Sequence, residues 1–337
     1  MLKLATMRLL AGDVGGTKTL LGIYEGSGDA LREVRTARYD SGDFDGLTAI
    51  IDHFLGEDGV EIDRAGFGVA GPVVDDRART TNLPWTLDAQ RLSDSLGAPV
   101  ALVNDFAAVA YGVRSLGPDE RVVLQEGTVD PEGPVAILGA GTGLGQALII
   151  PTGADPLHVL PSEGGHADFA PRDELEIGLL RFLLERHDRV SVERAVSGPG
   201  LAAIYDLVVS RRILPENPEV RRRLQAGGDA GRVIGEHALA GDDAACSRAV
   251  SIFLSLYGAE AGNLALRVIP TGGLYVGGGI APRLLPLIQT GVFMESFLRK
   301  GRMRPLLERV RVTVIDQPRV GLLGARNAAL VLLNTTR

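Results

Sequence analysis

The sequence predicts an α/β protein that is divided into two domains. Its 337 residues are 45% hydrophobic, which suits a chain with a sizeable core, and chains of this length usually form more than one domain. Two glycine-rich turns, at residues 12–18 and 139–145, each lie between two apolar runs, a pattern that indicates strand, tight turn and strand. Because each turn opens its own half of the chain, the second half is a weak internal echo of the first.

The charge and cysteine content exclude several classes of function. The net charge of −7 and the pI of about 5.4 give no general attraction to nucleic acid or anionic lipid. Cys246 is the only cysteine, which excludes an internal disulfide and a cysteine-rich zinc site. No apolar run reaches the roughly 18–20 residues that span a bilayer, and residues 1–7 are too short for a signal peptide. We expect a cytoplasmic protein with no membrane or nucleic-acid partner, whose translation starts at Met1 or Met7.

The first glycine turn has the sequence Gly12-Asp13-Val14-Gly15-Gly16-Thr17-Lys18, and strands are expected at 9–11 and 20–24. Glycine lets a ligand approach the main chain, and successive N–H groups in such a turn can form a concave anion site. Asp13 repels phosphate unless a cation lies between them, so the turn favours a metal–nucleotide complex. The alternative is a glycine hairpin with a surface aspartate. Lys18 contacts phosphate or faces solvent, and the sequence does not choose between these.

The elements after this hairpin alternate between strand and helix. We expect a strand at 31–39, a helix at 45–55, a buried strand at 65–70, a polar loop at 73–85 and a helix at 87–96. The loop carries Asn82 and the only tryptophan, Trp85. Long loops inside a domain are often functional, and the alternative is a surface excursion pinned by Trp85.

Asn104 and Asp105 directly follow the apolar strand expected at 99–103, and a helix begins after them. In α/β sheets ligands bind outside the carboxyl ends of strands, which favours these two side chains as site residues. The alternative is that they cap the helix, but capping explains only one of them.

The second half begins with a polar segment at 118–134, which is a plausible crossover between domains. A strand at 135–138, the second glycine turn at 139–145 and a strand at 146–150 follow. A dinucleotide-binding fingerprint requires a helix after its glycines, so we reject a Rossmann site.

Glu163 and His166 flank two glycines after a short strand at 158–160. This spacing can present a carboxylate and an imidazole to one small polar ligand. A metal site is a competing interpretation, but no second histidine lies nearby in the sequence. The third interpretation is a hydrogen-bonded core histidine.

Helices dominate the rest of the chain. We expect one after the cap at Asp173, a short one at 191–194, one at 197–212, the longest at 242–268, one from Ala281 and a terminal one at 319–333. The run Arg221-Arg222-Arg223 indicates a solvated helix face. Strands are expected at 272–276 and 310–315. Between strand and helix, Gly277, Gly278 and Gly279 let a flat ring or ribose lie against the backbone.

Taken together, these motifs resemble the bacterial ATP-dependent glucokinases that lack the cysteine-rich zinc motif. They run in the family's order across nearly the whole chain. The residues that carry the resemblance are Gly12-Asp13-Val14-Gly15-Gly16-Thr17, Asn104-Asp105-Phe106, Gly139-Ala140-Gly141-Thr142-Gly143-Leu144-Gly145, Glu163-Gly164-Gly165-His166 with Asp168-Phe169-Ala170-Pro171, Ser197-Gly198-Pro199-Gly200 and Gly277-Gly278-Gly279-Ile280.

The resemblance implies a two-domain actin/hexokinase/Hsp70-like (ribonuclease H-like) fold with its active site in the interdomain cleft. A small α/β domain would comprise residues 1–116 and 318–337, and a large one residues 117–317. The ROK sugar kinases share the first turn, but they typically carry a His/Cys zinc site, which this chain cannot build with Cys246 alone. A helix-turn-helix region, which a ROK repressor would carry ahead of Gly12, is also missing.

The implied reaction is transfer of the γ-phosphoryl group of ATP to the 6-hydroxyl group of glucose. Asp105 would be the general base, and Mg²⁺ would be held by Asp13, directly or through water. A homodimer is a family expectation. The residues implied at the sugar are Asn82, Asn104, Asp105, Glu163, His166 and Glu193, and those at ATP are Gly12, Asp13, Val14, Gly15, Gly16, Thr17, Gly141, Thr142, Gly143, Gly277, Gly278 and Gly279.

The chemistry of the sugar residues agrees with this assignment, since a hydroxyl group both donates and accepts hydrogen bonds. Glu193 rests on a short Ser-Val-Glu-Arg match, and its alternative is an ordinary first-turn helix acid. Three other functions remain open: a kinase for another hexose or with ADP or polyphosphate as donor, a non-catalytic sugar sensor, and an Hsp70-like ATPase module. The last would not need the Asn-Asp and Glu-x-x-His pairs, and no peptide-binding domain follows residue 337.

Overall fold

The computed structural model describes residues 6–27, 30–56, 60–80, 83–152 and 158–333. Asn82 lies outside the described residues. Contacts within the chain divide it into two compact units, residues 1–117, 149–161 and 317–337 and residues 118–148 and 162–316.

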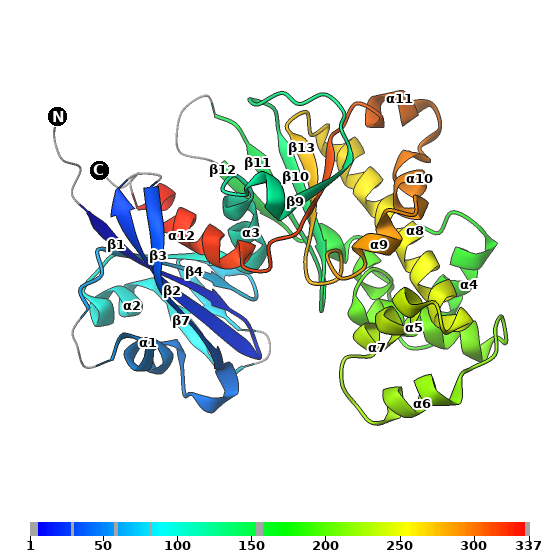
Figure 1. The fold of residues 1–337 in the computed structure, drawn as a ribbon, viewed down its shortest axis with the longest axis horizontal. Coiled ribbons are helices and arrows are strands. Elements are labelled where there is room, and N and C mark those ends of the chain that lie inside the picture. The colour runs from blue at the N-terminus through cyan, green and yellow to red at the C-terminus, as the bar shows by residue number, and fades with distance from the viewer. Residues whose placement is uncertain (1–5, 28–29, 57–59, 81–82, 153–157, 334–337) are drawn as a thin grey trace. The chain divides into compact units, whose positions relative to one another are not determined.

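The first unit contains a five-stranded sheet in the order β3-β2-β1-β4-β8 (Figure 1). Strand β1 is antiparallel to β2 and parallel to β4, and β4 is parallel to β8, so the carboxyl ends of β1, β4 and β8 meet at one edge. This arrangement confirms the predicted hairpin and the strands after it. The bounds are β1 (Met7–Val14), β2 (Lys18–Ser27), β3 (Ala30–Asp40), β4 (Arg64–Val69) and β8 (Val100–Asn104).

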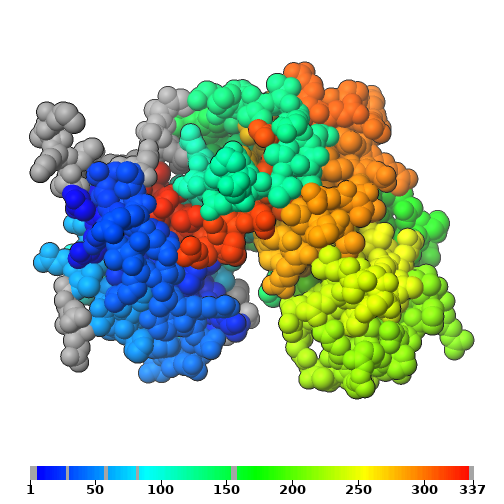
Figure 2. Space-filling model, viewed as in Figure 1, coloured from blue at the N-terminus to red at the C-terminus, as the bar shows by residue number. Residues whose placement is uncertain are grey.

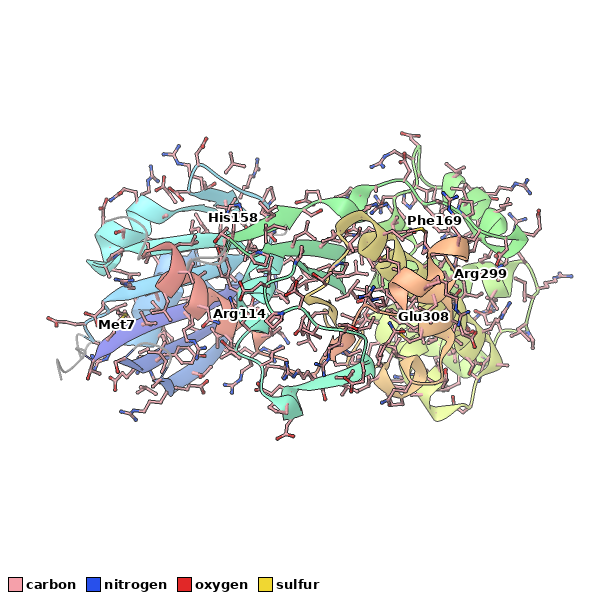
Figure 3. The ribbon with its side chains drawn as sticks, turned by 90° about the horizontal axis from the view of Figure 1, so that it is seen from above. Met7, Arg114, His158, Phe169, Arg299 and Glu308 are labelled. Carbon is pink, nitrogen blue, oxygen red and sulfur yellow. The ribbon has the colours of Figure 1, made fainter. Side chains whose placement is uncertain are left out.

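Helices cover both faces of this sheet, as is required because apolar side chains of β1 point alternately to the two faces and are buried on both. Leu10 and Val14 belong to the core that includes α1 (Leu47–Leu55) and α2 (Ala89–Leu96), whereas Leu9 and Ala11 pack against α12 (Val320–Leu332). In Figure 3, Met7 marks the first residue of β1, and Arg114 directly follows α3 (Asp105–Val113).

Helices α3 and α12 touch backbone to backbone through glycine. A Cβ atom on Gly324 would lie 1.6 Å from the Ala108 carbonyl oxygen, and one on Gly66 of β4 would lie 2.1 Å from the Ala325 carbonyl oxygen. Only glycine allows so close an approach. This contact fixes the position of α3, and therefore of Asp105 at its start.

The predicted loop at 73–85 was wrong in part, because three short strands form a small sheet there. Strands β5 (Val73–Val74), β6 (Arg77–Arg79) and β7 (Thr86–Asp88) pair in order. The turn between β5 and β6 uses Asp75 and Asp76 with φ of 50° and 58°, where glycine or asparagine usually signals a hairpin. Trp85 is buried, as the pinning role required.

The second sheet has six strands in the order β12-β11-β10-β13-β14-β9. Strands β10, β13 and β14 are parallel, and β9 pairs antiparallel with β14 at the edge. Strand β9 lies inside the segment predicted as a polar crossover. Its apolar run, Val122-Val123-Leu124, is only three residues long within that polar segment, and all five residues of the strand are half-buried. The bounds are β9 (Arg121–Gln125), β10 (Val135–Ala140), β11 (Leu144–Ile150), β12 (His158–Ser162), β13 (Gly273–Gly277) and β14 (Val312–Ile315).

Helix α8 (Ala244–Val268) forms the core of the second unit and confirms the longest predicted helix. Among the described residues it is the one helix long and apolar enough to cross a membrane, which the sequence did not predict. Because 78% of its apolar window is buried inside the protein, it has the character of a core helix. Further helices are α4 (Glu174–Leu184), α5 (Gly198–Ser210), α6 (Pro218–Gln225), α7 (Ala230–Ala240), α9 (Leu285–Ile288), α10 (Val292–Leu298) and α11 (Arg304–Leu307).

Several helix predictions need correction. Residues Val192–Arg194 form a 3₁₀ turn, and the helix expected from Ala281 begins at Leu285 after a series of turns. Helices α7, α10 and α11 were not predicted. The arginine run lies on α6, at the surface seen in green at the lower edge of Figure 2, and pairs with glutamates, as a solvated face should.

Candidate active site

The first glycine turn connects β1 to β2 and is held by Ser41. The Gly15 N–H donates to the Lys18 carbonyl at 3.0 Å, the Ser41 N–H donates to the Thr17 carbonyl at 2.9 Å, and the Ser41 hydroxyl donates to the Gly15 carbonyl at 3.0 Å. No hydrogen bond found among the described residues uses the N–H groups of Gly16 and Thr17. A fixed turn with available N–H groups is what an anion site requires. The Lys18 side chain is exposed.

Asp13 and Asp105 form an acidic pair in the first unit. Asp13 lies near the end of β1, and a Cβ atom on Gly321, in the first turn of α12, would lie 2.9 Å from its Oδ2 atom. Burial, and then the charge of Asp105, raise the pKa of Asp13 to about 6. A buried carboxylate beside a second carboxylate fits a divalent cation, which would relieve the cost of ionising Asp13.

Asn104 is the N-cap of α3, so the capping interpretation holds for this residue. Its Oδ1 atom accepts hydrogen bonds from the N–H groups of Phe106 at 2.9 Å and Ala107 at 3.2 Å, and its Nδ2 atom donates to the Gly71 carbonyl at 3.0 Å. Both ends of the amide are thus engaged inside the protein. Asp105 begins the helix and accepts at 2.8 Å from the Phe106 N–H.

The second glycine turn connects β10 to β11, and Glu193 lies on it. The Glu193 Oε2 atom accepts a hydrogen bond from the Leu144 N–H at 2.9 Å. A Cβ atom on Gly143 would lie 2.4 Å from the same oxygen, so a side chain there would have to displace the carboxylate. The Gly141 N–H donates to the Gly143 carbonyl at 2.8 Å and closes the turn.

His166 lies between two carboxylates in the second unit. Its Nε2 atom is 3.7 Å from Glu163 Oε2, and its Nδ1 atom is 4.0 Å from Glu193 Oε1. The His166 side chain is 56% exposed, which excludes a buried core histidine. The structure therefore brings together three of the residues predicted at the sugar, at separations longer than direct hydrogen bonds.

The two glycines between Glu163 and His166 are needed because the segment packs directly on β11. A Cβ atom on Gly165 would lie 2.1 Å from the Leu144 carbonyl oxygen, and one on Gly164 would lie 2.2 Å from Gln146 Oε1. The sequence showed the two glycines between Glu163 and His166 but not that their packing on β11 requires them.

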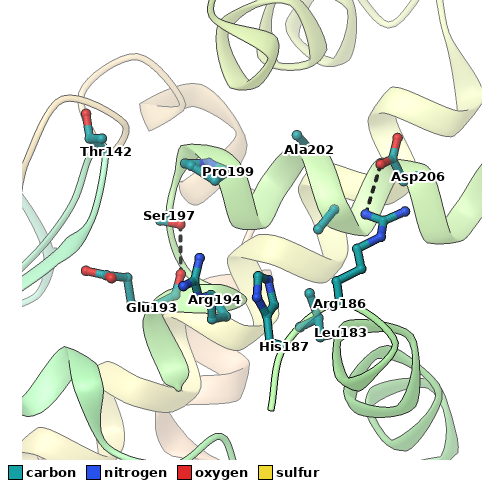
Figure 4. A pocket seen from close by; sticks show the side chains of 11 residues that line it. Thr142, Leu183, Arg186, His187, Glu193, Arg194, Ser197, Pro199, Ala202 and Asp206 are labelled. Carbon is teal, nitrogen blue, oxygen red and sulfur yellow. Dashed lines mark hydrogen bonds and ion pairs between the residues drawn. The ribbon is translucent and has the colours of Figure 1, made fainter. Parts of the chain in front are cut away.

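A pocket of about 340 Å³ adjoins the turn and Glu193 (Figure 4). It is lined by the turn, by the end of α4 and the segment that follows it, and by α5, with the residues Thr142, Leu183, Arg186, His187, Glu193, Arg194, Ser197, Pro199, Ala202, Ala203 and Asp206. The Ser197 hydroxyl donates to the Glu193 carbonyl at 2.7 Å and accepts from the Gly200 N–H at 3.1 Å, which caps α5. The Ser-Gly-Pro-Gly motif thus ties the start of α5 to the segment that carries Glu193.

The third glycine motif begins at the end of β13. Gly278 has φ of +80°, and a Cβ atom there would lie 2.4 Å from the Ala140 carbonyl oxygen. The Ile280 N–H donates to that same carbonyl at 3.2 Å. Glycine is therefore required at Gly278 both by conformation and by space.

The side chains that could bind a metal ion in the candidate site are carboxylates, which are oxygen ligands. Among the described residues there is no group of three or more His, Cys, Asp and Glu side chains that could hold a metal ion. Asp13 fits Mg²⁺, which is usually bound by one or two carboxylates together with water and phosphate. Cys246 is buried, and burial raises the pKa of its thiol, which disfavours the reactive thiolate.

Comparison with known proteins identifies the family. The family model described as Glucokinase matches residues 10–331. A glucokinase of Nostoc sp. is 48% identical over 333 residues, which cover 94% of this chain and 97% of the relative. The crystal structure of a glucokinase from an Antarctic psychrotroph has a TM-score of 0.82 at 31% identity and covers 96% of this chain and 98% of that one.

A ROK family glucokinase from Streptomyces griseus, whose structure contains glucose and AMPPNP, is more distant. Its TM-score is 0.66 at 23% identity, and the match covers 96% of this chain and 99% of that one. The mixed α/β sheets of both units fit a two-domain sugar kinase. The chain therefore belongs to the glucokinase family, in the bacterial group outside the ROK sugar kinases.

Proposed function

We propose that this protein is a glucokinase that transfers the γ-phosphoryl group of ATP to the 6-hydroxyl group of glucose, giving glucose 6-phosphate and ADP. The observation that carries the proposal is the family match over residues 10–331. The assembly of Glu163, His166 and Glu193 beside the second glycine turn supports it, because a sugar and a phosphate chain must lie together in such an enzyme.

The fold that goes with this function is the actin/hexokinase/Hsp70-like fold. Its support is that each unit carries one glycine turn between two strands. The small domain would comprise residues 1–116 and 318–337 and the large domain residues 117–317, with the active site in the cleft between them. A homodimer in the cytoplasm is part of the same proposal.

Asp105 is the general base in this mechanism. It accepts the proton of the 6-hydroxyl group as the new bond to phosphorus forms, and it holds that oxygen in line with the leaving group. Phosphoryl transfer depends mainly on positioning and charge neutralisation, and base catalysis contributes roughly 10²–10⁴-fold. Asn104 contacts the sugar with whatever hydrogen-bonding capacity its capping role leaves, and Asn82 is a further sugar residue.

Glu163, His166 and Glu193 bind the hydroxyl groups on the sugar ring. Gaps of 3.7 and 4.0 Å between the imidazole and the two carboxylates leave those polar atoms able to turn towards hydroxyl groups. A site built from such partners strongly rejects a sugar that lacks one hydroxyl, because a polar group is left unpaired.

The glycine turns bind ATP. Gly12, Val14, Gly15, Gly16 and Thr17 bind the phosphates from one side. Gly141, Thr142 and Gly143 bind them from the other, and Gly277, Gly278 and Gly279 hold the adenosine. Asp13 holds Mg²⁺ directly or through water, and the ion neutralises phosphate charge when it is bound.

The test is identification of the product. Purified protein with ATP, Mg²⁺ and glucose should yield ADP and glucose 6-phosphate in equal amounts, and ADP should not form without glucose. Mannose, fructose and N-acetylglucosamine as acceptors, and ADP or polyphosphate as donors, test the alternative kinases. Sugar binding without any turnover would instead support a sugar sensor and contradict the proposal.

A further inference from the structure

Tyr257 joins the two nucleotide turns of the second unit at their bases. It lies in the middle of α8, which packs against β10 and β13 (Figure 1), and it is fully buried. Its hydroxyl accepts a hydrogen bond from the Ala140 N–H at 3.0 Å and donates one to the Gly277 carbonyl at 3.1 Å. These are the last residues of β10 and β13, from which the turns at 141–143 and 278–279 leave the sheet.

The hydroxyl group therefore bridges the two strands where the turns begin, next to the last residue pair of the ladder, Gly139 and Gly277. Both backbone groups are buried, and the tyrosine ring is held by packing against Phe253 and Phe293. Without the hydroxyl, the Ala140 N–H and the Gly277 carbonyl would each lose a hydrogen-bond partner beside this last pair of the ladder, which is costly in a dry interior.

Glu260 lies about one turn further along α8 and supports residues 163–166, hereafter called the sugar segment. Its Oε1 atom accepts a hydrogen bond from Gln146 Nε2 at 3.0 Å, and the carboxamide oxygen of Gln146 packs against Gly164. Gly164 lies between Glu163 and His166. The position of Gln146 thus sets where this segment rests on β11.

The Glu260 carboxylate is itself held firmly. Asn263 Nδ2 donates to Oε2 at 2.8 Å, and Arg267 Nη1 lies 3.2 Å from Oε1, so the buried charge is paired and hydrogen-bonded. The Glu260 side chain is 2% exposed. A buried polar network with all members paired is rigid, which suits a positioning role.

We propose that α8 positions the two halves of the substrate site independently, the nucleotide turns through Tyr257 and the sugar segment through Glu260 and Gln146. Neither α8 side chain touches a substrate. The inference rests on the proposed function for the roles of the turns and the segment, but the contacts themselves can be tested without it.

The kinetic experiment compares two α8 variants in the full-length protein. Tyr257→Phe keeps the ring and removes the hydroxyl, and it should raise the KM for ATP about five- to tenfold while the KM for glucose stays within about twofold. Glu260→Gln keeps the shape of the side chain but replaces one hydrogen-bond acceptor by a donor. It should raise the KM for glucose about five- to tenfold while the KM for ATP stays within about twofold. Gln146→Met tests the same link from the β11 side and replaces Glu260→Gln if that variant does not fold.

Matched controls separate positioning from loss of stability. Tyr205→Phe removes a buried hydroxyl of α5 that has no hydrogen-bond partner among the described residues. Glu176→Gln alters a buried carboxylate of α4 that pairs with Arg172. These controls should leave the ratio of the two KM values unchanged, although Glu176→Gln should lower the melting temperature.

Hydrogen exchange gives a readout that does not depend on turnover. Peptides covering 139–143 and 277–280 should exchange faster in Tyr257→Phe, and the peptide covering 162–167 faster in Glu260→Gln, each without change in the other region. A parent protein that fails to phosphorylate glucose would contradict the proposed function yet leave this test valid. Equal rises in both KM values, unchanged KM values, or exchange that rises everywhere would overturn the proposal.

Discussion

Several glycines near the candidate site are explained by the groups that pack against them, because a Cβ atom would clash with those groups. Gly143 leaves room for the Glu193 carboxylate, Gly165 for the Leu144 carbonyl and Gly321 for the Asp13 carboxylate. In each case a side chain would occupy the position of a functional group or of the backbone that supports one. The glycine motifs therefore reflect close packing around the candidate site as well as turn conformation.

Gly143→Ala tests this reasoning at the second turn. The new methyl group would lie 2.4 Å from Glu193 Oε2 and should displace the carboxylate, so we expect the KM for glucose to rise at least about tenfold. Gly141→Ala, in the same turn, meets nothing within 4 Å, and Glu193 should stay in place. Steady-state kinetics with varied glucose decide the matter, and a similar KM for glucose in both variants would contradict the assignment.

Asp13 gives a pH dependence whose sign can be worked out. Its pKa is raised from 3.8 to about 6, so the folded protein binds this proton more tightly than the unfolded chain. The stability that protonated Asp13 contributes to the folded protein is fully present below about pH 4 and is lost as the pH rises through 6. Asp13→Asn removes this loss, so without Mg²⁺ it should unfold at higher urea concentration than the parent at pH 8.

The size of that difference is at most about 3 kcal/mol, because a pKa shift of one unit corresponds to about 1.4 kcal/mol. The difference should shrink towards pH 4. Urea unfolding curves of both proteins at pH 4, 6 and 8 supply the measurement. A variant that is less stable than its parent at pH 8 would show that the ionised Asp13 is stabilised in the folded protein.

Among the elements, α3 and α12 illustrate how a close helix contact positions Asp105, the proposed general base. Gly324→Ala places a methyl group 1.6 Å from the Ala108 carbonyl oxygen and should push the helices apart. We expect a loss of about 1–3 kcal/mol in the free energy of unfolding, and a fall in kcat as Asp105 moves. Denaturant unfolding and kinetics measure the two effects.

Gly178→Ala in α4 is the matched control, because its new methyl group meets nothing within 4 Å. Replacing a helical glycine by alanine should stabilise the protein by about 1 kcal/mol. Equal destabilisation of both variants would mean that the α3–α12 contact has no special role.

Much of the element order could be predicted from local patterns. The strands around both turns, the cap at Asp173 and the extent of α8 follow from apolar periodicity and capping chemistry, whereas the cap at Asn104 was only the alternative to a site residue. The hairpin at Asp75 and Asp76 was missed because its residues with positive φ are not glycine. Strand β9 was missed because its run of three apolar residues is short and shows no alternation.

The candidate site could be predicted only in part. The sequence identified Glu163 and His166 from their spacing, and Glu193 through the resemblance. The bond from Glu193 to the Leu144 N–H joins residues far apart in the chain and has no local signal. Tyr257 and Glu260 lie in an apolar helix, where nothing in the pattern distinguishes a tyrosine or glutamate that holds the site from any other.

At the scale of the whole molecule, the proposed mechanism assigns Asp105 of the first unit and Glu163, His166 and Glu193 of the second unit to the same sugar. We expect glucose to draw the units together, because water must be excluded to prevent hydrolysis of ATP. Small-angle X-ray scattering should show a smaller radius of gyration with saturating glucose than without it. Galactose, which differs from glucose at one hydroxyl group, serves as the control sugar, and no compaction with glucose would contradict the expectation.

The central claim is that Asp105 takes the proton during transfer of phosphate to glucose. The most direct measurement is the kcat of Asp105→Ala for glucose-dependent ADP formation at saturating substrates, with circular dichroism to verify folding. We predict a fall of roughly 10²–10⁴-fold with glucose still bound. A kcat within a few-fold of the parent value would contradict the claim.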